Sequence, residues 1–252
     1  GISNVFWGQS TSTIYGFDSF GSTSLNFSIL ENLPGLSSSH SGNINYIGSG
    51  AQDLLGINTD RTQFTGNLKI TLNDGNDSIT AIRTLTGDSI DMGAGDDQVN
   101  IYVNSGEAVN VHSLAKLDGG AGIDTLSFEV SGYGEAGATL TLTHRGATNF
   151  ENLTGTSQNE TINGDNNANV LAGGDGADTI NGGSGNDTLY AYNENTGPGS
   201  GGASSDNGDD NLYGEAGNDT LIASAGNNIL DGGTGADTIT SGSGSDTIIL
   251  RA

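Results

Sequence analysis

A nine-residue unit recurs in unbroken register through the C-terminal part of the chain. Four units run from residue 155 to 190, and five more run from 205 to 249 after an interruption at 191–204. The clearest unit, at 173–181, reads Gly-Gly-x-Gly-x-Asp-x-U-x, where U is aliphatic. The eighth position is aliphatic in all nine units: Ile162, Leu171, Ile180, Leu189, Leu212, Leu221, Leu230, Ile239 and Ile248. A turn followed by a strand of about three residues cannot bury a core alone, so the repeat predicts an all-β solenoid of stacked coils.

The turn half of the unit concentrates glycine and aspartate. Glycine occupies the fourth position in seven units, and aspartate occupies the sixth position in six. Glycine permits positive φ, so a tight turn can aim backbone carbonyls at one point, where the aspartate adds a carboxylate. Ca²⁺ takes about six to eight oxygen ligands in a flexible shell, whereas Mg²⁺ usually keeps several waters. The chain has no cysteine, which excludes thiolate metal sites and disulfides. The cofactor predicted is therefore Ca²⁺, bound as several ions.

The predicted metal-binding residues of the repeat are the sixth-position aspartates and the glycines of the same turns. The aspartates are Asp178, Asp187, Asp210, Asp219, Asp237 and Asp246. The glycines are Gly174, Gly176, Gly183, Gly185, Gly208, Gly217, Gly233, Gly235, Gly242 and Gly244.

Three further copies of the turn lie upstream at irregular spacing. They predict Asp77, Asp97 and Asp124 as ligands, and the glycines assigned to the same sites are Gly95, Gly120 and Gly122. The spacings of 20 and 27 residues between these aspartates exceed the length of two nonapeptides, as expected if the solenoid carries longer strands or loops here. The alternative is that the three aspartates only form Asx-type turns.

Three regions are predicted along the chain. Residues 1–66 hold most of the aromatic residues but no Gly-Gly-x-Gly-x-Asp, and form either a β cap or metal-free coils. Residues 67–154 form an irregular β-solenoid with scattered calcium turns. Residues 155–252 form the regular solenoid, with 191–204 as an insertion loop. The chain stops within a strand-like pattern and lacks an initiator Met, so we expect it to be a fragment of a longer protein.

The charge balance narrows the partners. Thirty acidic residues face six basic ones, and the formal net charge of −24 disfavours nucleic acids and anionic membranes. No apolar run reaches the roughly 20 residues that a membrane-spanning helix needs. Strong acidity is also typical of disordered tails, but the aliphatic residues here recur too regularly for disorder. Multivalent cations are the expected partners, and no nucleic acid and no membrane insertion are expected.

The tandem nonapeptides of residues 155–249 resemble those of the repeats-in-toxin (RTX) family. The resemblance implies a right-handed parallel β-roll with two units per coil, and Ca²⁺ between turns of successive coils on the same edge. It also implies type I secretion from a Gram-negative bacterium, hence an extracellular or cell-surface location. This sequence departs from the pattern at the sixth position, with Glu160, Asn169 and Asn228, and at the fourth, with Gln158 and Asn167. Sites that use those turns should be weak or empty.

Two units per coil fix which turns become neighbours. In the first block Glu160 lies over Asp178 and Asn169 over Asp187. In the second block Asp210, Asn228 and Asp246 form one row, and Asp219 and Asp237 form the other. If the interruption loops out, the pairs with aspartate on both sides are 178 with 210, 187 with 219 and 219 with 237. These pairs should bind Ca²⁺ most tightly, because each supplies two charges to one ion.

No catalytic constellation stands out, so no catalytic residue and no enzymatic activity are predicted. The six basic residues are scattered, and neither a Gly-x-Ser-x-Gly elbow nor a His-Glu-x-x-His zinc motif occurs. We expect a calcium-binding structural module of a cell-surface or matrix protein, of the S-layer or adhesin type, which folds on Ca²⁺ outside the cell and can associate with copies of itself. The alternative is the C-terminal secretion and folding module of an RTX exoenzyme or cytolysin whose active domain lies outside this chain.

Overall fold

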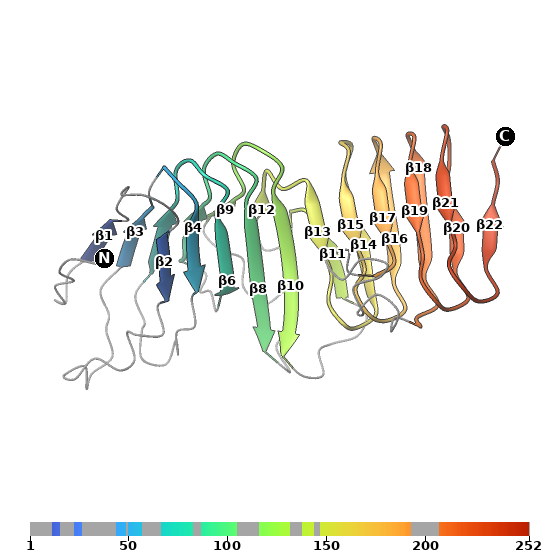
Figure 1. Cartoon of the computed structure of the whole chain (residues 1–252), viewed down its shortest axis with the longest axis horizontal. Coiled ribbons are helices and arrows are strands. Elements are labelled where there is room, and N and C mark those ends of the chain that lie inside the picture. The colour runs from blue at the N-terminus through green and yellow to red at the C-terminus, as the bar shows by residue number, and fades with distance from the viewer. Residues whose placement is uncertain are drawn as a thin grey trace. The chain divides into compact units, whose positions relative to one another are not determined.

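A computed structural model describes residues 12–15, 23–26, 44–48, 50–56, 67–82, 87–104, 116–131, 138–143, 147–192 and 207–251. The regular structure in these ranges is entirely β-strand (Figure 1), which confirms the predicted all-β class. The strands pair in parallel, as a β-roll requires. Among the described residues there is no helix with the length and apolarity needed to cross a membrane.

The chain divides into two compact units. The first comprises residues 1–102, 110–126 and 143–150, and the second comprises 103–109, 127–142 and 151–252. Two described strands, β8 (Gln98–Asn104) and β10 (Thr125–Ser131), contain residues of both units.

The first unit is built from two sets of parallel strands. One sheet has the order β1 (Ser12–Tyr15), β3 (Ile44–Ile47), β5 (Leu68–Thr71), β7 (Ser89–Asp91), β9 (Lys116–Asp118) and β12 (Ala147–Thr148). The other set has the order β2 (Thr23–Asn26), β4 (Asp53–Gly56), β6 (Ser78–Ile82) and β8 (Gln98–Asn104). The chain thus alternates between the two sets, and each visit to both sets makes one coil.

The second unit repeats this plan with the regular nonapeptides. One sheet has the order β11 (Ala138–Thr141), β14 (Glu160–Asn163), β16 (Thr179–Ser184), β18 (Asn211–Ala216), β20 (Ile229–Asp231) and β22 (Thr247–Ile249). The other has the order β13 (Asn152–Thr154), β15 (Val170–Ala172), β17 (Thr188–Tyr190), β19 (Thr220–Ile222) and β21 (Thr238–Thr240). Successive nonapeptides therefore enter the two sheets in turn, and two nonapeptides make one coil, as predicted.

The eighth-position side chains form the core between the two sheets of the second unit. Ile180 lies opposite Leu212, which lies opposite Leu230, and all three are fully buried. Leu171, Leu189 and Leu221 stack in the same way on the other sheet. Burying one such side chain contributes about 1.5–3 kcal/mol, so a coil with one inward aliphatic per strand depends on its neighbours for stability.

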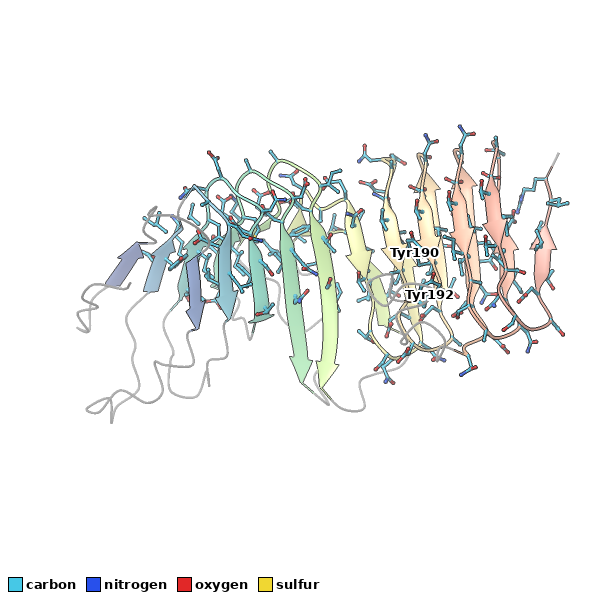
Figure 2. All side chains as sticks on the ribbon, viewed as in Figure 1. Tyr190 and Tyr192 are labelled. Atoms are coloured by element: carbon cyan, nitrogen blue, oxygen red, sulfur yellow. The ribbon has the colours of Figure 1, made fainter. Side chains whose placement is uncertain are left out.

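The interruption leaves the register of the coils unchanged. Asn181 before it pairs with Tyr213 after it, and Leu189 pairs with Leu221. At its start, Tyr190 and Tyr192 pack edge to face with ring centroids 5.7 Å apart (Figure 2). The predicted coil order across the interruption is confirmed by this register, whereas most of the predicted insertion loop, residues 193–204, lies outside the described residues.

Candidate metal sites in the stacked turns

The sixth-position aspartates are buried, which is unusual for a carboxylate. In the second unit the exposed fraction is at most 1% for Asp178, Asp187, Asp210 and Asp219. In the first unit it is at most 2% for Asp77, Asp97 and Asp124. Asp237 and Asp246, in the last described coil, are partly exposed. The turns thus place the predicted ligands away from bulk water.

A ladder of backbone hydrogen bonds joins these carboxylates from coil to coil. The N–H of Asp178 donates to Oδ1 of Asp210 at 2.8 Å, and the N–H of Asp210 donates to Oδ1 of Asn228 at 2.9 Å. The same row begins with Glu160 donating to Asp178 and ends with Asn228 donating to Asp246. The predicted order of this row is confirmed.

The second row follows the same rule on the other edge. Asn169 donates to Asp187 at 2.8 Å, Asp187 donates to Asp219 at 2.8 Å, and Asp219 donates to Asp237 at 3.0 Å. The three predicted aspartate pairs are therefore neighbours in the structure. That each pair shares one Ca²⁺ stays a prediction.

The first unit contains a row of its own despite its irregular spacing. Asp77 donates to Oδ1 of Asp97 at 2.7 Å, and Asp97 donates to Oδ1 of Asp124 at 2.8 Å. The row starts one coil earlier, because the N–H of Asp53 donates to Oδ1 of Asp77 at 2.6 Å. The edge therefore keeps its stacking although the aspartates are irregularly spaced in the sequence.

Two buried aspartates were missed by the sequence analysis. Asp53 is fully buried, and so is Asp88, which accepts a hydrogen bond from the N–H of Leu68 at 2.8 Å. Each precedes a buried aliphatic residue by two positions, Leu55 and Ile90, as in the nonapeptide. That short signal could have identified them, but neither turn carries the full glycine pattern.

Several carboxylates keep one oxygen unsatisfied. The second oxygen, Oδ2, of Asp77, Asp97, Asp187 and Asp219 is buried and has no hydrogen-bond partner in the described part of the chain. A buried anionic oxygen without a partner costs several kcal/mol, so a cation is the natural complement.

In two turns that depart from the repeat pattern, the sixth-position side chain accepts hydrogen bonds within its own turn. Glu160 accepts hydrogen bonds from the N–H and Oγ1 of Thr156, at 3.0 and 2.6 Å. In the next turn Oδ1 of Asn169 accepts from the N–H of Asp165 at 2.9 Å. These turns need no ion to complete their hydrogen bonding, which supports the expectation that they bind Ca²⁺ weakly.

The electrostatic setting favours cation binding. Burial raises the pKa of Asp77 to about 7, and the charge of Asp97 adds to the effect. Burial raises the pKa of Asp187 to about 6, with a further contribution from Asp219. Burial also raises the pKa of Asp97, Asp219 and Glu160. Stacked like charges in a dry turn are unfavourable, and a divalent ion relieves both the burial and the repulsion.

The turn glycines are required by backbone geometry and by close stacking. The predicted positive φ is found at Gly95, Gly120, Gly122, Gly174, Gly176, Gly183, Gly185, Gly217, Gly233, Gly235, Gly242 and Gly244. Gly208 is different, because it is not in the left-handed region, yet a Cβ on it would meet the carbonyl oxygen of Gly176. A Cβ on Gly176 would in turn meet the carbonyl oxygen of Gln158. Only glycine lets successive turns approach this closely.

The donor set fits Ca²⁺ better than a transition metal. No three His, Asp or Glu side chains of the described residues converge on one point. The aspartate pairs bring together two carboxylates from successive coils, and we expect backbone oxygens of the glycine turns to supply the other ligands. A flexible, all-oxygen shell of this kind suits Ca²⁺ and lacks the nitrogen and sulfur ligands typical of Zn²⁺.

An outer ladder at the fifth position also joins the turns. Oδ1 of Asp209 accepts the N–H of Asn227 at 2.7 Å, and Oδ1 of Asn227 accepts the N–H of Ser245 at 3.0 Å. Oδ1 of Asn218 likewise accepts the N–H of Ala236 at 2.8 Å. These residues are exposed and engage each other without an ion, so we separate them from the buried sixth-position ligands.

Comparison with known families gives an independent test of the repeat. Residues 154–189, 204–239 and 213–248 match the RTX calcium-binding nonapeptide repeat (4 copies). Comparison with curated proteins yields no significant match. The matched residues coincide with the coils whose aspartates form the two rows of the second unit.

Proposed function

Residues 154–189 and 204–248 are RTX calcium-binding nonapeptide repeats, and on that premise we propose that this calcium-binding structural module serves at a bacterial cell surface or in an extracellular matrix. RTX repeats bind Ca²⁺ and occur in secreted proteins, and the repeat itself is structural rather than catalytic. The finer assignment to an S-layer or adhesin type of protein rests on the extended, coil-by-coil architecture, which is suited to spacing and assembly.

The observation that carries the calcium assignment is the set of buried, unsatisfied Oδ2 atoms in the stacked turns. They belong to aspartates of consecutive coils, such as Asp187 and Asp219. Filling these positions with Ca²⁺ would stabilise every pair of coils at once. Folding would then be linked to the free calcium concentration, which is low inside cells and high outside.

A calcium titration tests this linkage on the full chain. Circular dichroism should show little parallel-β signal in excess chelator and a cooperative gain as Ca²⁺ is added. Magnesium at the same concentration serves as the control, because it dehydrates reluctantly and should restore little structure. A full β signal in chelator would contradict the proposal.

Self-association is proposed at the last described coil. Ile248 occupies a core position but is 46% exposed, whereas the equivalent Ile180 and Leu212 are fully buried. Leu250 is 86% exposed. Exposed apolar residues of this kind favour contact between copies of the chain. Sedimentation at high protein concentration in Ca²⁺ tests this, and a strictly monomeric species would rule it out.

A further inference from the structure

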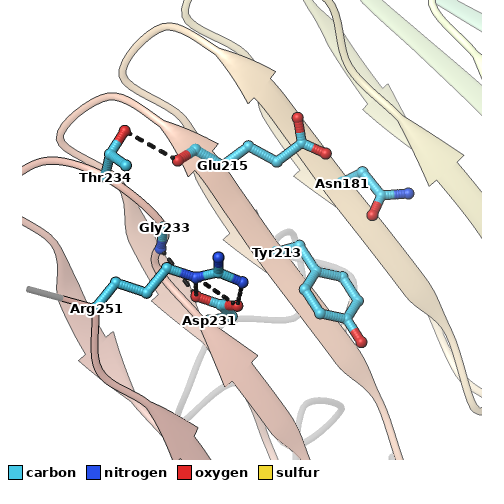
Figure 3. Close-up of a pocket in the computed structure, with 7 residues that line it drawn as sticks. All are labelled: Asn181, Tyr213, Glu215, Asp231, Gly233, Thr234 and Arg251. Carbon is cyan, nitrogen blue, oxygen red and sulfur yellow. Dashed lines mark hydrogen bonds and ion pairs between the residues drawn. The ribbon is translucent and has the colours of Figure 1, made fainter.

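A concave pocket of about 440 Å³ lies on the outer face of the second unit (Figure 3). Asn181, Tyr213 and Asp231 line it from three successive coils, because they are ninth-position residues paired in register across β16, β18 and β20. Ninth-position side chains point away from the core that the eighth-position residues fill. Glu215, Gly233, Thr234 and Arg251 complete the lining. Gly233 also belongs to the predicted metal-binding residues, whereas none of the side chains that line the pocket does.

The pocket offers both hydrogen-bond donors and acceptors beside an aromatic ring. Arg251 forms a two-pronged ion pair with Asp231, with Nε 2.8 Å from Oδ1 and 3.0 Å from Oδ2. Nη2 also donates to Oδ2 of Asp231, so the pair leaves the N–H donors of Nη1. Asn181 donates its amide to Asn163 at 2.7 Å, which leaves its Oδ1 as an acceptor. Within the described chain, the hydroxyl of Tyr213 makes no hydrogen bond.

Glu215 is the most unusual residue of the pocket. Its φ is 73°, and it occupies the second position of its unit, where Gly183 and Gly233 have φ of 104° and 91°. A left-handed backbone is unfavourable for a side-chain-bearing residue other than Asn or Asp. Its backbone oxygen accepts hydrogen bonds from the N–H and Oγ1 of Thr234, but its exposed carboxylate makes no hydrogen bond or ion pair with any described residue. Strain of this kind is concentrated at functional sites.

We propose that this pocket binds a saccharide unit. One face of a sugar ring would stack on Tyr213, while neighbouring hydroxyl groups would bind the Glu215 carboxylate, Oδ1 of Asn181 and the free N–H donors of Arg251. An anion is disfavoured because Asp231 already neutralises Arg251 and Glu215 adds a negative charge. A simple cation would leave the Tyr213 and Arg251 donors without partners. A neutral polyhydroxylated ligand uses both kinds of group.

Saccharide binding, a property separate from calcium binding, is tested on the calcium-loaded full chain. The probes are cellohexaose, maltohexaose and mannohexaose, titrated to about 10 mM in isothermal calorimetry, a range suited to weak single-site binding. At least one probe should bind. Tyr213→Ala and Glu215→Gly should each weaken that binding by about tenfold or more, because one removes the stacking surface and the other a charged acceptor.

Two controls separate a binding defect from a folding defect. Tyr190→Ala removes the ninth-position tyrosine of β17, which lies on the other sheet, and should leave saccharide binding unchanged. Glu215→Gly introduces the residue that the two nonapeptides stacked on either side have at this position, Gly183 and Gly233. The melting temperature of this variant should be unchanged or higher, and it should bind the same number of calcium ions. Failure of all three probes to bind the wild-type chain overturns the proposal. So does loss of a calcium ion in Glu215→Gly, or binding of methylammonium without any saccharide.

Discussion

The backbone N–H of Asp178 donates to Oδ1 of Asp210 at 2.8 Å, although the two residues are 32 positions apart in the sequence. Elsewhere in the same row the corresponding partners are 18 positions apart. The 14-residue interruption at 191–204 therefore adds length without shifting the coils. Asp187 and Asp219 show the same relationship on the other edge. Both rows of predicted calcium ligands continue across the interruption. Each row therefore forms one uninterrupted series in the second unit.

Asp219 should be the most sensitive single position in this series. It neighbours both Asp187 and Asp237, so Asp219→Asn removes one charge from two predicted sites. Affinity at those two sites should fall by about tenfold or more, because the number of charged ligands tunes calcium affinity. Calorimetric titration with Ca²⁺ measures both the number of sites and their affinity.

Asp209→Asn is the matched control for this substitution. Asp209 is exposed, and its Oδ1 accepts the N–H of Asn227, a role that an asparagine oxygen can also fill. The control also removes one negative charge from a turn of the second unit, but at a position outside the buried rows. Equal losses in the two variants would show that overall charge, and not the buried pair, governs binding.

Asn228→Asp should strengthen calcium binding where the sequence is degenerate. Asn228 is 1% exposed and lies between Asp210 and Asp246, so an aspartate there completes two carboxylate pairs. The variant should gain stability in Ca²⁺ and lose stability in chelator, since it adds a fourth buried carboxylate to the row and removes the hydrogen bond from the Asn228 amide to Asp246. Thermal melts in Ca²⁺ and the parallel-β signal that remains in chelator measure the two effects. A change of the same sign in both conditions would argue against an ion at these turns.

The nonapeptide period predicted the inward aliphatic positions, and the two units per coil that the RTX resemblance implied then gave the coil length and the order of both aspartate rows. These predictions were possible because each nonapeptide contains its own turn residues and its own strand residues, and equivalent positions of the nonapeptides stack on one another. Asp53 and Asp88 were missed because their turns keep only the aspartate and the following aliphatic residue. The ladder through Asp209 and Asn227, and the strain at Glu215, depend on contacts between coils and on φ, which a local pattern does not reveal.

The calcium-free protein should be more stable in mild acid than at neutral pH. The pKa of Asp77 is raised to about 7 and that of Asp187 to about 6, mainly by burial, whereas an aspartate in the unfolded chain titrates near 3.8. The folded state therefore binds more protons between about pH 4 and 7, and the stability that protonation contributes is lost as the pH rises through this window.

Circular dichroism in excess chelator at pH 5 and pH 7.5 measures this effect through the fraction of folded chain. The parallel-β signal, small at pH 7.5, should be larger at pH 5. With saturating Ca²⁺ the unfolding midpoint in denaturant should instead be lower at pH 5, because protons compete with the metal for the same carboxylates. An identical signal at the two pH values in chelator would count against buried, protonatable aspartates in the turns.

A pair of glycine substitutions in the first unit should show whether the irregular turns need the same close stacking as the regular ones. Gly95 has a φ of 142°, and a Cβ there would meet the carbonyl oxygen of Gly75 in the preceding coil. Gly50 is outside the left-handed region, and a Cβ there would meet no atom within 4 Å. Gly95→Ala should destabilise the calcium-loaded chain by about 1–3 kcal/mol, through backbone strain and the displaced carbonyl. Gly50→Ala should be neutral or slightly stabilising, because it reduces the freedom of the unfolded chain. Denaturant melts of both variants in Ca²⁺ give the comparison, and equal stability of the two would mean that the first-unit turns can separate without loss.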